Sequence, residues 1–280
     1  MKKLVSSIPR LLVLVSLLCM ASLASAQTVP VSVDVNGQVA TIRVGSVASP
    51  VADLTLTFDD ATGLSASSLG VSAQLVNPAD PGLLARLSDA QLLQLDGAFP
   101  LLVTIEPPAA QGLKFNRTVR VEVHTHALAY SVGSFYRLFK APVGGQFSDI
   151  TDEIAPGSVR ARGTTSGFSQ FLVLTDLRRS DVVVAGKFAA VRATLATLPS
   201  AEREPLAALL ASAEAAVAGE DYVAAGNSLD AFRARVAARA GTGIDQQWRA
   251  GGALSNPAGA LLAGAATLKF SIAYLRDYGL

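Results

Sequence analysis

The sequence has few of the residue types on which common functional sites depend. It contains one cysteine, two histidines and one tryptophan in 280 residues, and only 16% of its residues are charged. The cysteine, Cys19, lies in the N-terminal apolar segment, so a chain without that segment has no disulfide, thiolate metal site or cysteine nucleophile. A P-loop, a Gly-x-Ser-x-Gly motif and a Gly-x-Gly-x-x-Gly sequence before a helix are also absent. The sequence therefore predicts that the protein is not an enzyme.

An excess of charge of either sign is missing as well. The 23 basic and 22 acidic residues give a formal net charge of +1. Proteins that bind nucleic acid usually carry a marked basic excess, because affinity comes largely from the phosphate backbone. We therefore expect no nucleic-acid partner.

The first 26 residues are typical of a cleavable export signal. A basic start, a short apolar core and a small-residue cleavage site follow one another: Lys2, Lys3 and Arg10, then residues 11–20, then Ala24-Ser25-Ala26. The apolar core is shorter than a membrane-spanning helix needs. We expect cleavage between Ala26 and Gln27, which leaves a periplasmic or secreted protein with a net charge of −2.

Residues 27–177 show the alternation of apolar and polar residues that is typical of antiparallel strands. In Val119–His126 the valines take every second position, and polar side chains take the other face. Asn36-Gly37 and Gly144-Gly145 predict hairpin turns. Leu83–Leu95 reads as a short helix or an irregular cover. With about nine expected strands, the segment predicts an Ig-like β-sandwich.

From Ser180 onward the apolar spacing changes to the 3.6-residue period of helices. Ser200 is expected to cap the second helix, and Asn256 with Pro257 to open the last. The expected helices cover about 181–199, 201–218, 220–240 and 257–276. The fold class is therefore α+β by segregation, with an antiparallel sandwich domain of residues 27–177 followed by an α-helical hairpin or bundle domain of residues 178–280.

Two resemblances follow from these residues. The helical spacing at Ala225, Leu229, Phe232 and Val236 resembles that of the FIMAH-type helical module, which implies an accessory role in a secreted protein. The strings VRVEVHTHALAY, YRLFKAPVGGQFSDITDE and FSQFLV resemble an uncharacterised family of exported bacterial proteins. The last string also resembles the end of ZU5-like sandwiches, some of which cleave themselves at His-Phe-Ser. Here Gly167 stands where that histidine would be.

One cluster has the chemistry of a metal site. Glu122, His124 and His126 are two residues apart on one expected strand, so their side chains share a face. Two imidazoles and a carboxylate suit zinc or another divalent ion. The alternative is a solvated strand face, because no further histidine or cysteine is present to complete a closed site. Metal binding through Glu122, His124 and His126 stays an alternative function, and no other cofactor is expected.

Two groups of acidic residues have the oxygen ligands that Ca²⁺ prefers. Asp149, Asp152 and Glu153 follow the glycine turn, and Asp59-Asp60 form a pair. Neither group has the spacing of an EF-hand loop, so turn and strand-end roles are the simpler interpretation.

Residues 258–275 form a nearly continuous apolar run that contains Lys269. A membrane-spanning helix and a packed fourth helix both fit this run. Alanine and glycine supply much of it and contribute little to membrane insertion, so packing is favoured.

These observations predict an exported, non-catalytic binding or structural module of the cell envelope. Its partner would be another envelope protein or a polysaccharide. Arg233, Arg235 and Arg239 are available for an anionic partner on the third helix, although neighbouring acidic residues balance them. The alternatives are the metal-binding protein described above and an envelope protein tethered by its C-terminal helix.

Overall fold

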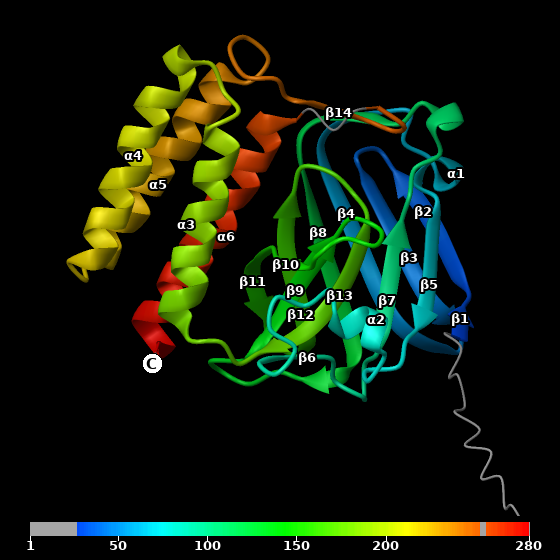
Figure 1. Ribbon diagram of the computed structural model, residues 1–280. Coiled ribbons are helices and arrows are strands. Elements are labelled where there is room, and N and C mark those ends of the chain that lie inside the picture. Colours follow the sequence, from blue (N-terminus) through cyan, green and yellow to red (C-terminus); the bar gives the residue numbers. More distant parts are fainter. Residues whose placement is uncertain (1–26, 253–255, 280) are drawn as a thin grey trace, which may run out of the picture.

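The computed structural model describes residues 27–252 and 256–279. In this part of the chain, fourteen strands form two antiparallel sheets, and a helical region follows them (Figure 1). The protein is therefore an α+β protein in which thirteen of these described strands precede the long helices, as the sequence predicts, and one short strand, Gln247–Arg249, lies between the last two of them. The predicted signal peptide, residues 1–26, lies outside the described residues.

Each sheet has seven strands. Sheet I runs in the order β1 (Gln27–Val29), β5 (Val71–Leu75), β7 (Leu101–Ile105), β13 (Gln170–Asp176), β9 (Tyr136–Ala141) and β10 (Ser148–Asp149), with β6 (Leu93–Gln94) beside β13. Sheet II runs in the order β11 (Thr151–Ala155), β12 (Ser158–Thr165), β8 (Lys114–Ala129), β4 (Ser49–Thr62), β3 (Val39–Ser46) and β2 (Val31–Asn36), with β14 (Gln247–Arg249) beside β8. The chain crosses from sheet I to sheet II at Pro30, between β1 and β2.

The main core lies between the two sheets. Every second residue is buried along Ala52–Phe58 of β4 and Val119–Thr125 of β8, and these residues point toward sheet I, as Leu54 and Val121 do. Val103 and Val173 meet them from sheet I. This alternation is the one that the sequence shows, because side chains on a strand point to opposite faces in turn.

The outer faces of the two sheets differ. The outer face of sheet I is covered by the segment that contains α2 (Pro81–Leu84) and β6, through a second apolar cluster that includes Leu93 and Leu172. This confirms the cover expected over Leu83–Leu95, and it explains why β13 is apolar on both faces. Sheet II has a polar outer face.

The two predicted hairpins differ in outcome. β2 and β3 pair in register around a turn whose first central residue is Gly37, with φ of 59°. The second hairpin is confirmed only in part. Ser148 and Asp149 pair with β9, but from Thr151 the chain continues as β11 in sheet II. The two-residue strand β10 is followed at once by this change of sheet, which the local turn signal does not encode.

Four long helices match the predicted ones within a few residues. They are α3 (Ser180–Leu195), α4 (Ser200–Ala218), α5 (Tyr222–Arg239) and α6 (Pro257–Tyr278). Asn256 accepts a bond from the backbone of Gly259 and caps α6, as expected. The cap expected at Ser200 is wrong, because α4 starts there and Pro199, at the cap position, has no side-chain acceptor. Two single-turn helices, α1 (Ala66–Leu69) and η1 (Ala109–Gln111), lie in the β region.

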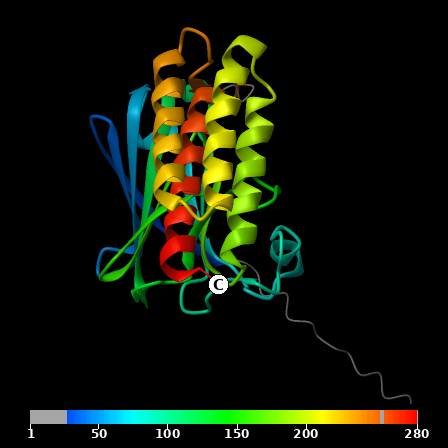
Figure 2. The ribbon, with the colours of Figure 1, turned by 90° about the vertical axis from the view of Figure 1, so that its left-hand side faces the viewer.

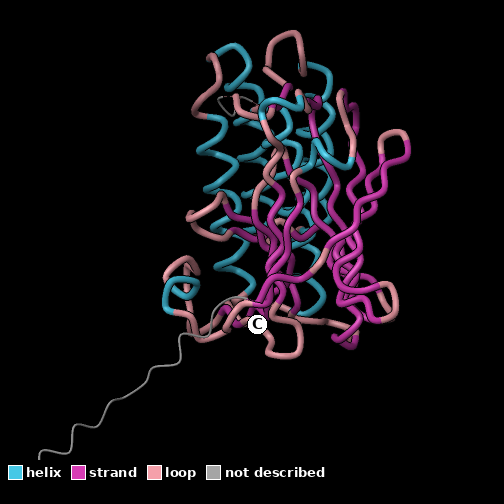
Figure 3. The backbone as a smooth tube through the Cα atoms, turned by 90° about the vertical axis from the view of Figure 1, so that its right-hand side faces the viewer, coloured by secondary structure: helices cyan, strands magenta, loops and turns pink. Residues whose placement is uncertain are grey.

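The helices stand against one edge of the sandwich. In Figure 1, α3 and α6 lie next to the strands, and α4 with α5 lie outside them. Figure 2 shows the four helices in front of the sheets, and Figure 3, seen from the opposite side, shows the strands in front of the helices. α6 contacts β8, β11 and β12 of sheet II as well as α3 and α5. Within the described chain it is a packed helix on several sides.

A buried ion pair joins the helices to sheet I. Nζ of Lys187 in α3 lies 2.6 Å from Oδ2 of Asp149 in β10. The same ammonium donates to the Thr267 and Ser271 hydroxyls of α6, at 2.5 and 2.8 Å. Three elements are therefore held together by one buried cation.

The segment between α5 and α6 returns to the sandwich. It contributes β14, which pairs with residues 114–116 of β8. Trp248 of β14 stacks on Phe115, with ring centroids 5.1 Å apart, and meets Phe168 edge to face. This strand could not be predicted from the sequence, because three residues are too few to show an alternation.

The close approach of α6 to β8 predicts a large effect of one methyl group. A Cβ at Gly259 would overlap the carbonyl oxygen of Arg117 in β8. Gly259→Ala is therefore expected to lower the free energy of unfolding by about 1–3 kcal/mol. Gly186, inside α3, has open space around it, and Gly186→Ala should instead add about 0.5–1 kcal/mol because alanine favours helix. Urea unfolding measures both, and equal effects of the two variants would contradict the packing.

Candidate metal-binding site

The two histidines of the chain lie on the outer face of sheet II. In β8, Val123 and Thr125 are buried against the core, and His124 and His126 point the other way. The hydroxyl of Thr125 donates to the carbonyl of Val159 in β12, which satisfies the polar atom on the buried side. The alternation of β8 thus brings both imidazoles to one surface, as predicted, with ring centroids 4.5 Å apart.

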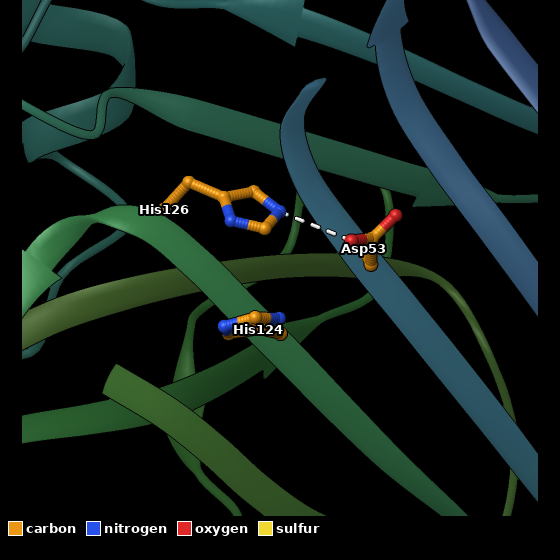
Figure 4. A group of neighbouring side chains, drawn as sticks. All are labelled: Asp53, His124 and His126. Atoms are coloured by element: carbon orange, nitrogen blue, oxygen red, sulfur yellow. Dashed lines mark hydrogen bonds and ion pairs between the residues drawn. The ribbon is translucent and has the colours of Figure 1, made fainter. Parts of the chain in front are cut away.

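The carboxylate that lies with them comes from β4. Asp53 is the register partner of His124 in the antiparallel pair β4–β8. Nε2 of His126 donates to Oδ2 of Asp53 at 3.0 Å (Figure 4). One ligand atom from each of Asp53, His124 and His126 lies within 4.8 Å of the others. Two nitrogens and one oxygen at such separations can converge on one divalent ion after small side-chain rotations.

The surroundings of His124 favour its neutral form. Its Nε2 is 2.7 Å from the hydroxyl of Ser158. Burial lowers the pKa of His124, and the charges of Arg160 and His126 lower it further. A neutral imidazole is the form that binds metal, so the ring of His124 can act as a ligand at neutral pH.

Glu122, the third residue of the predicted cluster, has other partners. Its carboxylate accepts from Arg160 at 3.3 Å and from Arg162. Burial alone would raise the pKa of Glu122, but hydrogen bonds and charges from Arg162 and then Arg160 outweigh it, so the pKa is lowered. The structure therefore groups the carboxylate of Asp53 with the histidines, while Glu122 on the same face pairs with Arg160 and Arg162. The polar position of Asp53 in an alternating strand was visible in the sequence, but its register with β8 was not.

The sequence model of a family of unknown function (DUF6689) matches residues 14–276. The chain belongs to this family. The match covers both sheets and the four long helices, the last of them as far as Arg276, so the expectation of an uncharacterised family that spans most of the chain is confirmed. No curated protein matches the chain.

In this DUF6689 chain the cluster of Asp53, His124 and His126 is bordered by cations. Arg43 of β3 pairs with Asp53 at 3.4 Å, and Arg160 lies on the other side. Further along the same face, a shallow groove of about 350 Å³ is lined by Arg120, Arg162, Glu122 and Glu153, with Thr55 and Thr57. Ion pairs join its charged residues. The outer face of sheet II is thus a charged and internally paired surface.

The acidic groups considered for Ca²⁺ are each used locally. Asp149 pairs with Lys187, and Asp152 accepts from the hydroxyl of Thr164. Glu153 pairs with Arg120 and Arg162. Asp59 accepts from Thr118, and Asp60 accepts from Asn116. These contacts give each carboxylate a structural role in the described chain, and Asp149, Asp152 and Glu153 are not gathered around one point.

Proposed function

We propose that this family member is an exported, non-catalytic binding protein of the cell envelope that binds a divalent transition-metal ion through Asp53, His124 and His126. The observation that carries the metal assignment is the convergence of three ligand atoms within 4.8 Å of one another. Export is supported by the signal pattern of residues 1–26. The accessory role is supported by the resemblance to Ig-like or ZU5-like sandwiches and to the FIMAH-type module.

The chemistry of the three residues suits zinc, and also nickel or copper. Imidazole nitrogen is a preferred ligand of all three ions, and a carboxylate completes a three-ligand set with open positions for water. The bound ion would replace the proton that His126 shares with Asp53. The site lies on the outer face of sheet II, where the side chains of His126 and Asp53 are 35% and 30% exposed to water, and this exposure favours capture of the ion over catalysis.

Calorimetry with Zn²⁺ alone tests this proposal. The protein is residues 27–280 without a histidine tag, stripped with a chelator before titration. We expect one ion per chain at pH 7.5, and affinity that falls with pH as the imidazoles gain protons. Asp53→Ala and the double variant His124→Ala/His126→Ala should each lose at least about tenfold in affinity.

Glu122→Gln is the matched control for the metal site. It removes the carboxylate that the sequence predicts as a ligand together with the histidines, and it keeps Asp53. We expect less than about a threefold change in Zn²⁺ affinity, because a fold change of that size corresponds to less than 1 kcal/mol. A wild-type protein that stays metal-free after zinc loading would exclude the metal assignment. If Glu122→Gln lowered the Zn²⁺ affinity more than Asp53→Ala does, the carboxylate ligand would be Glu122 and not Asp53.

The tethered alternative rests on α6. By length and composition this helix of 22 residues could cross a membrane, and half of its most apolar window is buried in the protein. Its Thr267 and Ser271 bind the buried ammonium of Lys187, and its Lys269 pairs with Asp230 of α5 at 2.6 Å. Insertion would break these contacts, so α6 as a packed helix fits the proposed function better. Residues 27–280 should then purify without detergent.

A further inference from the structure

A cleft of about 880 Å³ lies where the helices meet the end of the sandwich. It is distant in the fold from the metal-binding site, which occupies the outer face of sheet II. Its walls come from the end of α3, the connection between α3 and α4, the segment before β14, the start of α6 and the loop between β12 and β13. The larger apolar side chains that line it are Phe168, Leu198, Pro199, Ile244, Trp248 and Pro257. A cleft of this size and lining has the dimensions of a small-molecule site.

Lys140 of β9 is the one cation among the residues that line this cleft. It shares a face of β9 with Leu138, which belongs to the core between the sheets, so its side chain extends along the intersheet space to the end of the sandwich. Its Nζ lies 2.7 Å from the Thr165 hydroxyl. That hydroxyl donates to the carbonyl of Gly167, and so it accepts from the ammonium.

The ammonium of Lys140 has no carboxylate partner in the described part of the chain. Lys187 and Lys269, by comparison, each lie 2.6 Å from an aspartate oxygen. Asp245 also lines the cleft, but it forms no ion pair with Lys140 and has contacts of its own. Two of the three donors of the Lys140 ammonium are therefore available to a molecule in the cleft.

Burial among protein atoms disfavours the charged ammonium form of Lys140. Burial lowers the pKa of Lys140 to about 8, although the whole residue is only half-buried by accessible area. Both observations fit an amine that is surrounded by protein but open to the cleft. An anion placed beside it would restore the charged form, because an opposite charge within a few ångströms raises the pKa of an amine.

The start of α4 adds a second feature that favours an anion. This helix of 19 residues begins at Ser200, and no side chain caps its N-terminus. Leu198 and Pro199, the two residues before it, line the cleft. The backbone N–H groups of an uncapped first turn carry partial positive charge at this wall. The cleft also contains the carboxylate of Asp245, and Glu202 in the first turn of α4 pairs with Arg239. Apolar walls with one cation and so little excess positive charge match a monoanion with an apolar body better than a multiply charged phosphate.

We propose that this cleft binds a small organic carboxylate with an apolar body, whose carboxylate pairs with Nζ of Lys140 while its apolar part packs against Phe168 and Trp248. The indole nitrogen of Trp248 is buried without a hydrogen-bond partner among the described residues, so Trp248 contributes the apolar surface of its ring to this wall. The inference is independent of the metal-binding site.

Titration of residues 27–280 with sodium octanoate tests the assignment. Trp248 is the only tryptophan, so its fluorescence reports on the cleft directly, and calorimetry gives the stoichiometry. We expect one octanoate per chain. Octanol, with the same chain and no charge, should bind at least about tenfold more weakly. Lys140→Met should lose at least tenfold for octanoate and should leave octanol unchanged.

Two further variants separate ligand binding from folding. Lys114→Met removes an exposed lysine outside the cleft and should leave octanoate affinity unchanged. Ala193→Phe keeps Lys140 but fills part of the cleft from an exposed position on α3, and calorimetry should show at least a tenfold loss with unchanged circular dichroism. His126→Ala should bind octanoate as the wild type does.

A direct readout of the amine completes the test. After reductive ¹³C-methylation, the described chain has four lysines to assign, at positions 114, 140, 187 and 269. Octanoate should raise the titration midpoint of Lys140 and leave that of Lys114 in place. The proposal is overturned if the wild type shows no saturable binding of octanoate or benzoate, or if Lys140→Met binds octanoate as tightly as the wild type.

Discussion

Replacement of Lys187 by methionine is expected to lower the free energy of unfolding by about 3–5 kcal/mol at pH 7. Lys187 is buried in α3, and its ammonium contacts Asp149 of sheet I together with Thr267 and Ser271 of α6. Removal of the cation leaves the carboxylate of Asp149 without its paired ammonium in a position that water does not reach, and the charges of Arg137 and Arg178 act on it without forming an ion pair. A buried charge without a partner costs more than the pair itself contributes.

Lys269→Met is the matched control for this prediction. It also removes a lysine that lies 2.6 Å from an aspartate, but the side chain of Lys269 is 42% exposed and that of Asp230 is 50% exposed. The loss should stay below about 1 kcal/mol, because water screens an exposed pair. Guanidinium unfolding at equal pH measures both variants. A loss below 1 kcal/mol in Lys187→Met would contradict the buried-pair interpretation.

The double variant Lys187→Met/Asp149→Asn separates charge from packing. It removes both charges of the pair, so it should recover part of the stability that Lys187→Met loses. The pH dependence gives a second check. Burial alone would raise the pKa of Asp149, but the charge and hydrogen bond of Lys187, aided by Thr151, lower it. A depressed carboxyl pKa stabilises the folded state at neutral pH, and this contribution is lost as the pH falls through the folded-state pKa. The double variant should lack this acid-side loss.

The sequence predicts the helix that carries Lys187 but not the buried contacts of this lysine. The spacing of Val184, Phe188, Val191 and Leu195 predicted α3 within a few residues, because one face of a helix repeats every three to four positions. A lysine beside that stripe is usually solvated, and its partner Asp149 lies 38 positions earlier in the sequence. The sequence places Thr267 and Ser271 on the apolar stripe of α6, and these two hydroxyls were the only local sign of a buried polar contact.

Long-range contacts also explain why the candidate metal cluster of the structure, Asp53 with His124 and His126, differs from the predicted one. Alternation along β8 placed both histidines on one face, and this needs only the two-residue period of a strand. The choice between Glu122 and Asp53 depends on which strands lie beside β8 and in which register. β4 pairs with β8 across about 70 positions, and β12 places Arg160 and Arg162 beside Glu122. Long-range pairing of this kind is set by the whole core, so a single sequence does not reveal it.

Phe115→Ala is expected to have an effect as large as that of Lys187→Met, a loss of about 3–5 kcal/mol in the free energy of unfolding. Phe115 is 1% exposed and lies at the end of β8. Its ring meets Phe58 of β4 and Phe168 edge to face, at 5.5 and 5.7 Å, and stacks on Trp248 of β14. The variant removes three ring contacts and leaves a cavity that the two sheets cannot close.

The ring cluster lies between the helices and the sandwich, so Phe115→Ala also tests whether these two parts unfold together. Trp248 reaches the cluster from the segment between α5 and α6, so the rings join the helices to the end of the sandwich. Unfolding followed by Trp248 fluorescence and by circular dichroism at 222 nm, which reports mainly on the helices, should coincide in the wild type. In Phe115→Ala both transitions should move together to lower denaturant, since α6 also packs on β8.

Phe135→Ala is the control, because that ring is 54% exposed and its loss should cost less than about 0.5 kcal/mol. A fluorescence transition that moves while the helical signal stays in place would show that the helices fold independently of the sandwich.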